Sequence, residues 1–395
     1  MQRKLTLWTK IVIIGWIATI FFLFLYSFTQ IDLGLTLTRL TAWQVFQKNF
    51  QYIGYFQRPL SMNLYLGILF LLFIFYLLIL SQVKRGKLDL KKIWLMVFIT
   101  SGILWLSYNA FSYDLFNYIF YGKIITFYHQ NPYKFTALDF PGDPMLGFMH
   151  WTHNYYPYGP LWLAITLPLS VLGFNKFLLT LILFKGLAAA SYLAIVKSIE
   201  KILERVNPQA KLLGMAVFAF SPLVVIEGLV SAHNDIVMFA AAMIALLFLL
   251  EKKYVRAWLL LLLSIGMKYA TGMLLPFFVI VTFFPKVKLN WNKSFLIILA
   301  LMFIPFYLVT KRSELQPWYL LYFWPYAGLV PFKKWLFYPL LIFSLGMLLH
   351  YAPFLYTGSW TPWVILLKFI LIILSVTLAM LVGVILRIKE IKFPS

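Results

Sequence analysis

Long apolar runs, separated by short charged segments, follow one another along almost the whole chain. Many runs approach the length of about 20 residues that a helix needs to cross roughly 30 Å of hydrocarbon. Short segments of alternating polar and apolar residues, which a membrane β-barrel requires, do not occur. The pattern predicts an all-α, polytopic transmembrane protein of about 12 spans, near residues 9–29, 61–82, 93–110, 177–197, 211–230, 234–250, 257–267, 269–284, 294–310, 318–331, 335–355 and 363–386.

Two apolar runs leave a choice of interpretation. Residues 161–172 are too short to cross and contain Pro168, so we interpret them as an interfacial or re-entrant helix. Residues 257–284 could form one long span, but Lys268 interrupts them. We split this run at Lys268, which places the lysine near the outer side, whereas a single span would reverse every later loop.

Lys and Arg residues gather in one set of short loops, as the positive-inside rule describes for cytoplasmic segments. The cations of this set are Arg3, Lys4, Lys10, Lys84, Arg85, Lys87, Lys91, Lys92, Lys197, Lys201, Arg205, Lys211, Lys252, Lys253, Arg256, Lys286, Lys288, Lys293, Lys333, Lys334, Arg387, Lys389 and Lys392. The other set of loops is longer and carries far fewer. We therefore predict a cell-membrane protein with both termini cytoplasmic, and we interpret the first apolar run as a retained span.

Composition supports the membrane assignment and removes several classes of function. The chain is 63% hydrophobic and only 12% charged, against about 25% charged in soluble domains. The net charge of +22 follows from the cation-rich loops, so we expect membrane lipids and no nucleic acid as partners. The absence of cysteine excludes disulfides and thiolate chemistry.

Residues 107–160 form a long polar and aromatic stretch that the charge pattern places outside the membrane. Connections of this length are usually functional or disordered. The density of aromatic residues argues against disorder. We therefore predict a large structured extracytoplasmic loop within residues 107–176.

Asp114 lies just past the outer end of the third predicted span. A carboxylate at this boundary is costly unless it has a partner or a function, and it could accept a proton from an acceptor hydroxyl as a general base. It could equally be the N-cap of a helix beginning at Leu115. The residues alone leave both interpretations open.

His233, Asn234 and Asp235 are three consecutive polar residues between two apolar helices on the predicted outer side. Such a group could bind sugar hydroxyls, a phosphate or a metal. Asn234 or Asp235 could instead cap the helix that follows, a role that does not need His233.

Three lysines lie inside apolar runs, where a charge is expensive. Lys268, on the predicted outer side, could bind a phosphate or extend its amino group to lipid headgroups. For Lys185 and Lys368 we predict that the amino group extends to lipid headgroups.

Aromatic residues flank prolines in three segments of the predicted outer side. Their side chains could stack on sugar rings or form an ordinary interfacial belt. The aromatic residues in question are Tyr133, Tyr156, Tyr158 and Trp318, and Gln316 begins the segment that contains Trp318. His150, His153 and Asp143 could hold a metal only weakly, because they match no fixed ligand spacing, and we predict no metal and no cofactor.

In this order and spacing, the polar and aromatic segments resemble the GT-C superfamily of membrane glycosyltransferases. They are most similar to prokaryotic mannosyltransferases that use polyprenyl-phosphate mannose. The matching segments are Ser112-Tyr113-Asp114, Tyr118, Tyr121-Gly122, Asn131-Pro132-Tyr133, Tyr156-Pro157-Tyr158-Gly159-Pro160-Leu161-Trp162, His233-Asn234-Asp235, Lys268-Tyr269 and Gln316-Pro317-Trp318-Tyr319.

The resemblance implies an inverting hexosyltransferase that takes a sugar, expected to be mannose, from a polyprenyl-phosphate donor on the outer leaflet. A lipid-linked, glycan or protein acceptor receives it. Asp114 falls at the position of the family's catalytic aspartate, and Lys268 would suit the donor phosphate. The resemblance assigns substrate binding to Tyr118, Tyr133, Tyr156, Tyr158, His233, Asn234, Asp235, Lys268, Gln316 and Trp318. Many members need no metal.

The resemblance also suggests a division of the chain. Residues 93–330 would form the catalytic core and residues 331–395 the C-terminal helices. Residues 1–92 would be an N-terminal addition, whose outer loop, near residues 29–60, is amphipathic and is predicted to lie on the membrane surface.

A membrane transporter or flippase is the alternative function. Transporters often have paired halves with broken helices at corresponding positions, whereas here only the break at Lys268 is evident. Glucose, arabinose and an amino sugar stay open beside mannose, and nothing in the sequence indicates an oligomeric state.

Overall fold

The computed structural model describes residues 6–330 and 332–392, and within these ranges every regular element is helical. The all-α prediction is therefore confirmed for this part of the chain. Residues 1–5, with Arg3 and Lys4 of our charge count, lie outside the described residues. So do residue 331, at the end of one predicted span, and residues 393–395.

Among the described residues, six helices are long and apolar enough to cross a membrane. They are α1 (Leu7–Ser27) with η1 (Phe28–Gln30), α3 (Arg58–Lys84), α7 (Phe177–Val206), α12 (Trp291–Leu301) with α13 (Phe303–Arg312), α15 (Lys334–Leu349) with α16 (Tyr351–Thr357), and α17 (Pro362–Lys392). A seventh crossing results if η4 (Pro208–Ala210) and α8 (Lys211–Ala219) are joined with η5 (Val224–Val230), to which they are bent by 62°. The chain is thus a multi-pass membrane protein.

The other predicted spans form helices too short to cross alone. They are α4 (Leu90–Trp105), α9 (Asn234–Leu250), α10 (Tyr254–Met267), η6 (Tyr269–Leu274) with α11 (Leu275–Phe283), and η7 (Pro317–Tyr322) with α14 (Trp324–Ala327). At 1.5 Å per residue, α10 is only about 21 Å long. A count of about 12 spans therefore stays a prediction. The expected break at Lys268 is confirmed, because α10 ends at Met267.

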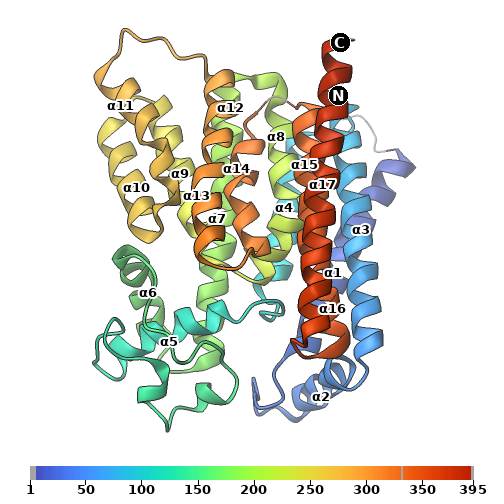
Figure 1. The fold of residues 1–395 in the computed structure, drawn as a ribbon, viewed down its shortest axis with the longest axis vertical. Helices are drawn as coiled ribbons and strands as arrows, with labels where there is room; N and C mark the ends of the chain where they lie inside the picture. The colour runs from blue at the N-terminus through green and yellow to red at the C-terminus, as the bar shows by residue number, and fades with distance from the viewer. Residues whose placement is uncertain (1–5, 331, 393–395) are drawn as a thin grey trace.

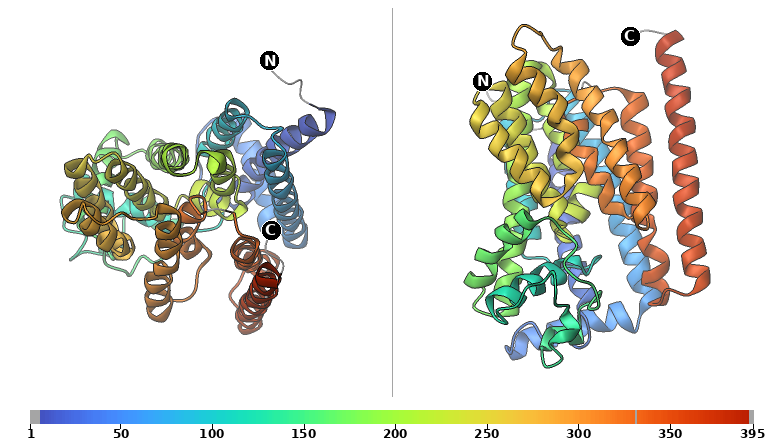
Figure 2. Two further views of the ribbon diagram at one scale, coloured as in Figure 1. Left: turned by 90° about the horizontal axis from the view of Figure 1, so that it is seen from above. Right: turned by 60° about the vertical axis from the view of Figure 1, so that its left-hand side comes forward.

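The long helices run roughly parallel to one another (Figures 1 and 2). In Figure 1, α9 to α11 lie on one side and α1 and α3 on the other, with α7 and α8 between them. Helix α7 packs against α4, α8 and α9, and α9 packs against α10. Every residue from 214 to 243 is buried, so the chain from α8 through η5 into α9 forms the centre of the molecule.

Residues 107–176 and the N-terminal connection lie at one end of the bundle (Figure 1). The former contain α5 (Asp114–Thr126), η2 (Ala137–Asp139), η3 (Pro144–Gly147) and α6 (Pro160–Leu172). The latter contains α2 (Thr41–Tyr55), whose Gln47 and Gln51 donate to the carbonyls of Leu35 and Ile31. Because these amides hold the preceding loop, α2 is fixed to the end of α1 and leaves Tyr52 exposed.

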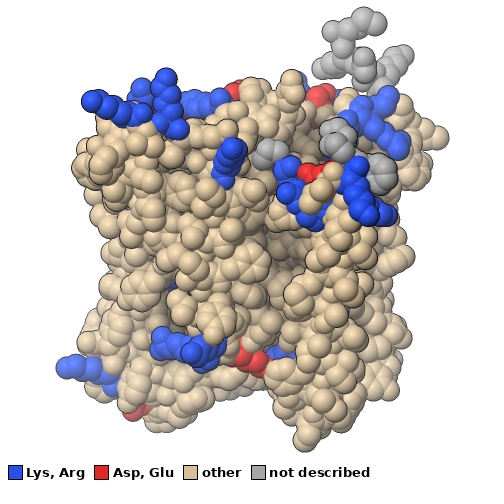
Figure 3. Space-filling view, turned by 45° about the horizontal axis from the view of Figure 1, so that its top comes forward, with Lys and Arg blue, Asp and Glu red and all other residues tan. Residues whose placement is uncertain are grey.

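Charged side chains are unevenly distributed over the two ends. The start of α1 and the end of α17 lie at the end opposite α2 and α5 (Figure 1). Lys and Arg gather around the former end, which is turned toward the viewer in Figure 3, whereas residues 107–176 at the other end carry only Lys123, Lys134 and Lys176. This separation is the one that the positive-inside rule describes, and the cytoplasmic position of the cation-rich end stays a prediction.

Candidate active site

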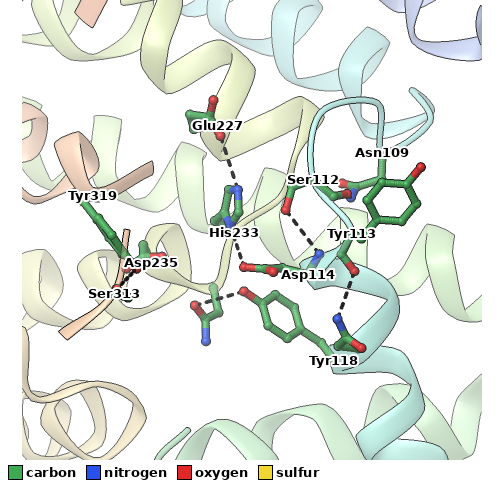
Figure 4. Close-up of polar contacts among 12 residues, drawn as sticks. Asn109, Ser112, Tyr113, Asp114, Tyr118, Glu227, His233, Asp235, Ser313 and Tyr319 are labelled. Carbon is green, nitrogen blue, oxygen red and sulfur yellow. Dashed lines mark hydrogen bonds and ion pairs between the residues drawn. The ribbon is translucent and has the colours of Figure 1, made fainter. Parts of the chain in front are cut away.

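Asp114 opens α5 and directs its carboxylate toward the centre of the molecule. The Ser112 hydroxyl accepts a hydrogen bond from the Asp114 backbone N–H at 3.2 Å, and Tyr113 occupies the N-cap position without a side-chain cap bond. Asp114 Oδ2 lies 3.5 Å from His233 Nδ1 instead of capping the helix (Figure 4). The capping interpretation of Asp114 is therefore wrong, because the side chain contacts a distant segment.

The segment that carries His233 has an unusual backbone. η5 is a π-helix of seven residues. This form is rare in proteins as a whole, but where it occurs it is often at a functional site. Two residues after the end of η5, Ala232 has a φ of 48°, in the left-handed region that a side chain with a Cβ disfavours. Together they turn the chain between η5 and α9, so that Glu227 and His233 face each other.

His233 lies in the short connection between η5 and α9, completely buried between two carboxylates (Figure 4). Its Nε2 is 3.3 Å from Glu227 Oε2, and its ring stacks on Trp318 at 4.2 Å between centroids. Burial lowers the pKa of His233, but contacts with Asp114 and Glu227 raise it more, to about 9. At neutral pH the ring is therefore an imidazolium shared by two acids.

Asn234 and Asp235 begin α9 and use their side chains for other contacts than capping. His233 takes the N-cap position without a side-chain cap bond. Asn234 Oδ1 accepts a hydrogen bond from the Tyr118 hydroxyl at 3.3 Å, and Asp235 Oδ2 accepts one from Lys268 Nζ at 2.7 Å. The capping interpretation of these residues is also wrong.

Lys268 is held at the break between α10 and η6. Its Nζ contacts the buried Asp235 and lies 5.6 Å from the centre of the Tyr158 ring. Gly159, which follows Tyr158 in the chain, donates its N–H to the Met267 carbonyl. A Cβ on Gly159 would lie 2.1 Å from the Gly266 carbonyl oxygen. Only glycine allows this approach, which holds the aromatic turn of residues 155–160 against Lys268.

Four of the predicted aromatic residues form one connected cluster. Tyr118 meets Tyr158 with ring centroids 5.2 Å apart, Tyr158 meets Tyr156 at 5.6 Å, and Tyr156 meets Tyr133 at 5.0 Å. Tyr118 lies one helical turn after Asp114, and Tyr158 contacts Lys268. The cluster therefore joins the two charged parts of the site by a second route.

Trp318 and Gln316 have different surroundings. Trp318 reaches the centre of the site through its stack on His233. The Gln316 amide donates to Glu314 at 3.2 Å, and Glu314 also pairs with Lys368 at 2.9 Å. The contacts of Gln316 thus do not join it to Asp114 or Lys268.

The predictions for Lys185 and Lys368 are wrong. Lys185 is buried within α7, where its amino group donates to the Ser107 hydroxyl at 2.9 Å and to the Leu229 and Val230 carbonyls. Lys368 is buried and pairs with Glu314. Neither amino group extends outward, because each has an acceptor on another segment of the chain.

Glu227 is a site residue that our sequence reasoning did not assign. It is completely buried in η5, and the Tyr351 hydroxyl of α16 donates to its Oε1 at 3.0 Å. The available signal was a carboxylate within an apolar run, which marks a functional candidate by default.

The weak metal grouping of Asp143 with His150 and His153 is not brought together by its contacts. Asp143 pairs with Lys123 and accepts a hydrogen bond from the Tyr128 hydroxyl at 2.6 Å. His150 stacks on Tyr113. Within the described part of the chain, no group of three or more acidic or histidine side chains is arranged to hold a metal ion.

Comparisons with known proteins agree with this arrangement. The family model described as alpha-(1->6)-mannopyranosyltransferase, N-terminal domain, matches residues 20–284. Alpha-(1->6)-mannopyranosyltransferase A of Corynebacterium glutamicum is 27% identical over 172 residues, which are 42% of this chain and 34% of that protein. The alignment thus covers about a third of that relative's length. No solved structure matches.

Proposed function

This chain belongs to the alpha-(1->6)-mannopyranosyltransferase family of membrane mannosyltransferases, and we propose that it moves a mannosyl group from a polyprenyl-phosphate donor to a lipid-linked, glycan or protein acceptor. The observation that carries the proposal is the contact of Asp114 with His233, two residues before Asp235 and its partner Lys268. The proposed proton acceptor and the proposed phosphate-binding cation thus both contact one short segment of chain, residues 233–235.

Asp114 is the proposed general base. In the transfer, the acceptor hydroxyl oxygen forms a bond to the anomeric carbon of mannose while its proton passes to Asp114. Asp114 is the most exposed of the three acid–base groups, with 19% of its side chain accessible, whereas His233 and Glu227 are fully buried. We therefore propose that Asp114 contacts the acceptor and that His233 orients the Asp114 carboxylate.

Lys268 is the proposed partner of the leaving group. When the bond between the anomeric carbon and the phosphate oxygen breaks, the electron pair stays on the phosphate. A positioned cation stabilises this charge in the transition state. Lys268 is 19% exposed beside a buried Asp235, so its amino group can turn to a donor phosphate without leaving the site.

We propose that the transfer inverts the anomeric carbon and occurs at the extracytoplasmic face. Two separate groups for proton uptake and phosphate release support a single displacement, because neither needs to become covalently bound to the sugar. The scarcity of Lys and Arg in residues 107–176, which contain α5, supports the outer position. With the short apolar helices counted as membrane segments, the chain would have about 12 spans.

The division at residues 1–92, 93–330 and 331–395 is likewise a proposal. Asp114, His233 to Asp235 and Lys268 fall within residues 93–330, and the last part supplies Tyr351 to Glu227. We expect a donor, an acceptor and membrane lipids as partners. The base and the cation of the proposed displacement are both side chains, so we propose that it uses no metal or other cofactor.

Reconstituted protein supplied with β-linked polyprenyl-phosphate [14C]mannose and a mannoside acceptor tests the proposal. We expect Asp114→Asn to lower kcat by about 10²–10⁴-fold, the contribution typical of a general base. Asp139→Asn is the matched control, because Asp139 caps a short helix of the same segment and an amide oxygen retains that bond. NMR of the product should show an α-linkage, the result of one inversion.

Full activity in Asp114→Asn would remove the base assignment. No transfer by the native protein, with the donor taken up unchanged across the vesicle membrane, would instead favour a transporter. A β-linked product would contradict inversion.

A further inference from the structure

A second polar and aromatic cluster lies beside the active site and is not used by the proposed reaction. We call it the Tyr113 platform, and it consists of Asp32, Tyr55, Tyr113, His150 and Trp151. The Tyr113 and His150 rings stack with centroids 3.7 Å apart and planes inclined by 22°. The His150 and Trp151 rings meet edge to face at 6.5 Å.

The N-terminal part of the chain supplies one side of the platform. A Cβ on Gly34 would lie 3.1 Å from the Gly147 carbonyl oxygen, so the turn after α1 packs closely against the chain that leads to His150. Asp32 Oδ1 accepts the N–H of Gly34 at 2.8 Å, which fixes the carboxylate within this turn. The region that we interpreted as an N-terminal addition therefore reaches the edge of the active site.

The charge of Asp32 acts on three aromatic members of the platform. Burial, and then Asp32, raises the pKa of Tyr113, and Asp32 also adds to the effects of burial and Tyr113 in raising the pKa of Tyr55. For His150, burial lowers the pKa and Asp32 opposes that change. The Asp32 carboxylate thus lies near enough to all three rings to act on their charge, and it offers hydrogen-bond acceptors in their neighbourhood.

The exposed side of the platform is formed at a cost in backbone energy. Trp151 is 54% exposed and has a φ of 58°, a conformation that bulky residues adopt rarely. His150 beside it is also exposed. A strained backbone that turns a large aromatic side chain outward is typical of binding sites.

The platform and the lysine lie on different sides of the proposed base. Tyr113 directly precedes Asp114 in the chain. Figure 4 shows Tyr113 and Asp235 on opposite sides of the Asp114 carboxylate, and Asp235 is the partner of Lys268. If Lys268 holds the donor phosphate, the acceptor must approach Asp114 from another direction, and the platform lies on that side.

We propose that the Tyr113 platform binds the saccharide of the acceptor, a mannoside whose free hydroxyl then reaches Asp114. The inference rests on the proposed function. Aromatic faces with a few placed polar groups are the usual lining of a small-molecule site. Here Tyr113, His150 and Trp151 give faces to the sugar rings, and the Asp32 carboxylate accepts from their hydroxyls.

Steady-state kinetics test the platform separately from the donor site. In Trp151→Ala and His150→Ala, we expect the KM for a mannoside acceptor to rise about tenfold, equivalent to about 1.4 kcal/mol, with the KM for the donor unchanged. Trp363→Ala is the matched control, because Trp363 is 50% exposed on α17 and outside the site. Equal changes in both KM values, or none, would overturn the inference.

Direct binding separates failure of the inference from failure of the proposed function. We expect methyl α-(1→6)-mannobioside to give a saturation-transfer NMR signal with the native protein, Asp114→Asn and Trp363→Ala, and a signal at least halved with Trp151→Ala. Binding by the native protein that Trp151→Ala retains, or no binding by any of them, overturns the platform. Binding that depends on Trp151, in a protein that transfers no mannose, supports the platform and rejects the reaction.

Discussion

Two charged regions meet at the start of α9, and they differ in composition and access. The first contains Asp114, His233 and Glu227, two acids that flank one buried ring. The second contains Asp235 and Lys268, a single pair of opposite charges in which the lysine is partly exposed. One region holds a proton between acids, whereas the other holds a cation that can exchange its partner.

Under the proposed function, this difference would let one short segment serve two chemical steps. A group that accepts a proton needs a neighbour that can adjust its own protonation, which the imidazole of His233 provides. A group that stabilises a departing phosphate needs a lasting positive charge, which Lys268 provides. Residues 233–235 keep the two apart by alternating their contacts between Asp114, Tyr118 and Lys268.

The largest effect is expected where the second region loses its cation. In Lys268→Met, kcat should fall about 10²–10³-fold, as it does when one preorganised donor is removed from a developing charge. The substitution also leaves Asp235 buried without its partner, and stability should fall by about 3 kcal/mol. Transfer assays and thermal unfolding followed by fluorescence measure the two losses.

The double variant Lys268→Met with Asp235→Asn separates these effects. Removal of the buried charge should restore the unfolding midpoint while activity stays low. Recovery of activity together with stability would mean that Lys268 serves only to neutralise Asp235, and the comparison between the regions would fail.

The first region should depend on Lys185, a buried residue that lies outside it. Lys185 joins Ser107, on the chain leading to Asp114, with the end of the π-helix that leads to His233. In Lys185→Met, two carbonyls and a hydroxyl lose a buried donor, and we expect stability to fall by about 2 kcal/mol. Lys197→Met is the control on the same helix, because Lys197 is half exposed and its pair with Glu200 contributes less than about 1 kcal/mol.

Activity per folded molecule distinguishes positioning from simple support. If Lys185 positions both groups, Lys185→Met should lower kcat without a change in the donor KM, and Lys185→Arg should recover part of it. Unchanged kcat in the folded fraction would limit Lys185 to a structural role.

The helical class and the break at Lys268 were predictable because apolar run length and a single cation are local signals. The number of crossings was not. Helix α9 begins directly after His233 and helix α10 ends directly before Lys268, so each has one end at a polar residue of the site. A run of apolar residues does not reveal whether its helix continues to the far surface or ends at a site.

The site was predictable where residues of one type were isolated in apolar surroundings. Asp114, His233 and Lys268 were found in this way; Asp114 contacts His233, and Lys268 contacts Asp235, two residues further along the chain. The capping alternatives could not be rejected from sequence, since a cap and a long-range contact use the same side chains. Glu227 was missed because its importance depends on the π-helix that turns it toward His233, a backbone form with no simple sequence signal.

The pH dependence of the first region should be altered by loss of Glu227. Against the opposing effect of burial, the contacts with Asp114 and Glu227 raise the pKa of His233 above its ordinary value, to about 9. The stability that its charge contributes is therefore fully present below about pH 6.5 and is lost as the pH rises through 9. Glu227→Gln removes one of the two carboxylates, so the pKa of His233 should fall. The loss of stability with rising pH should then begin at a lower pH than in the native protein.

Thermal unfolding midpoints between pH 6 and 10, with the pH profile of kcat/KM, measure this change. Asp235→Asn is the comparison variant, because Asp235 contacts Lys268 instead of His233. A profile that Glu227→Gln leaves unchanged, or that Asp235→Asn moves equally, would show that the two regions are not electrostatically distinct.

The smallest effect is expected at the hydrogen bond that lies between the regions. The Tyr118 hydroxyl donates to Asn234 at 3.3 Å, and both residues are buried. Tyr118→Phe keeps the ring packing against Tyr158 and removes only this bond, so stability should change by about 1 kcal/mol and kcat by a few-fold at most. If kcat instead falls as far as in Asp114→Asn, the hydroxyl takes part in proton transfer, and Tyr118 belongs to the first region as a reacting group.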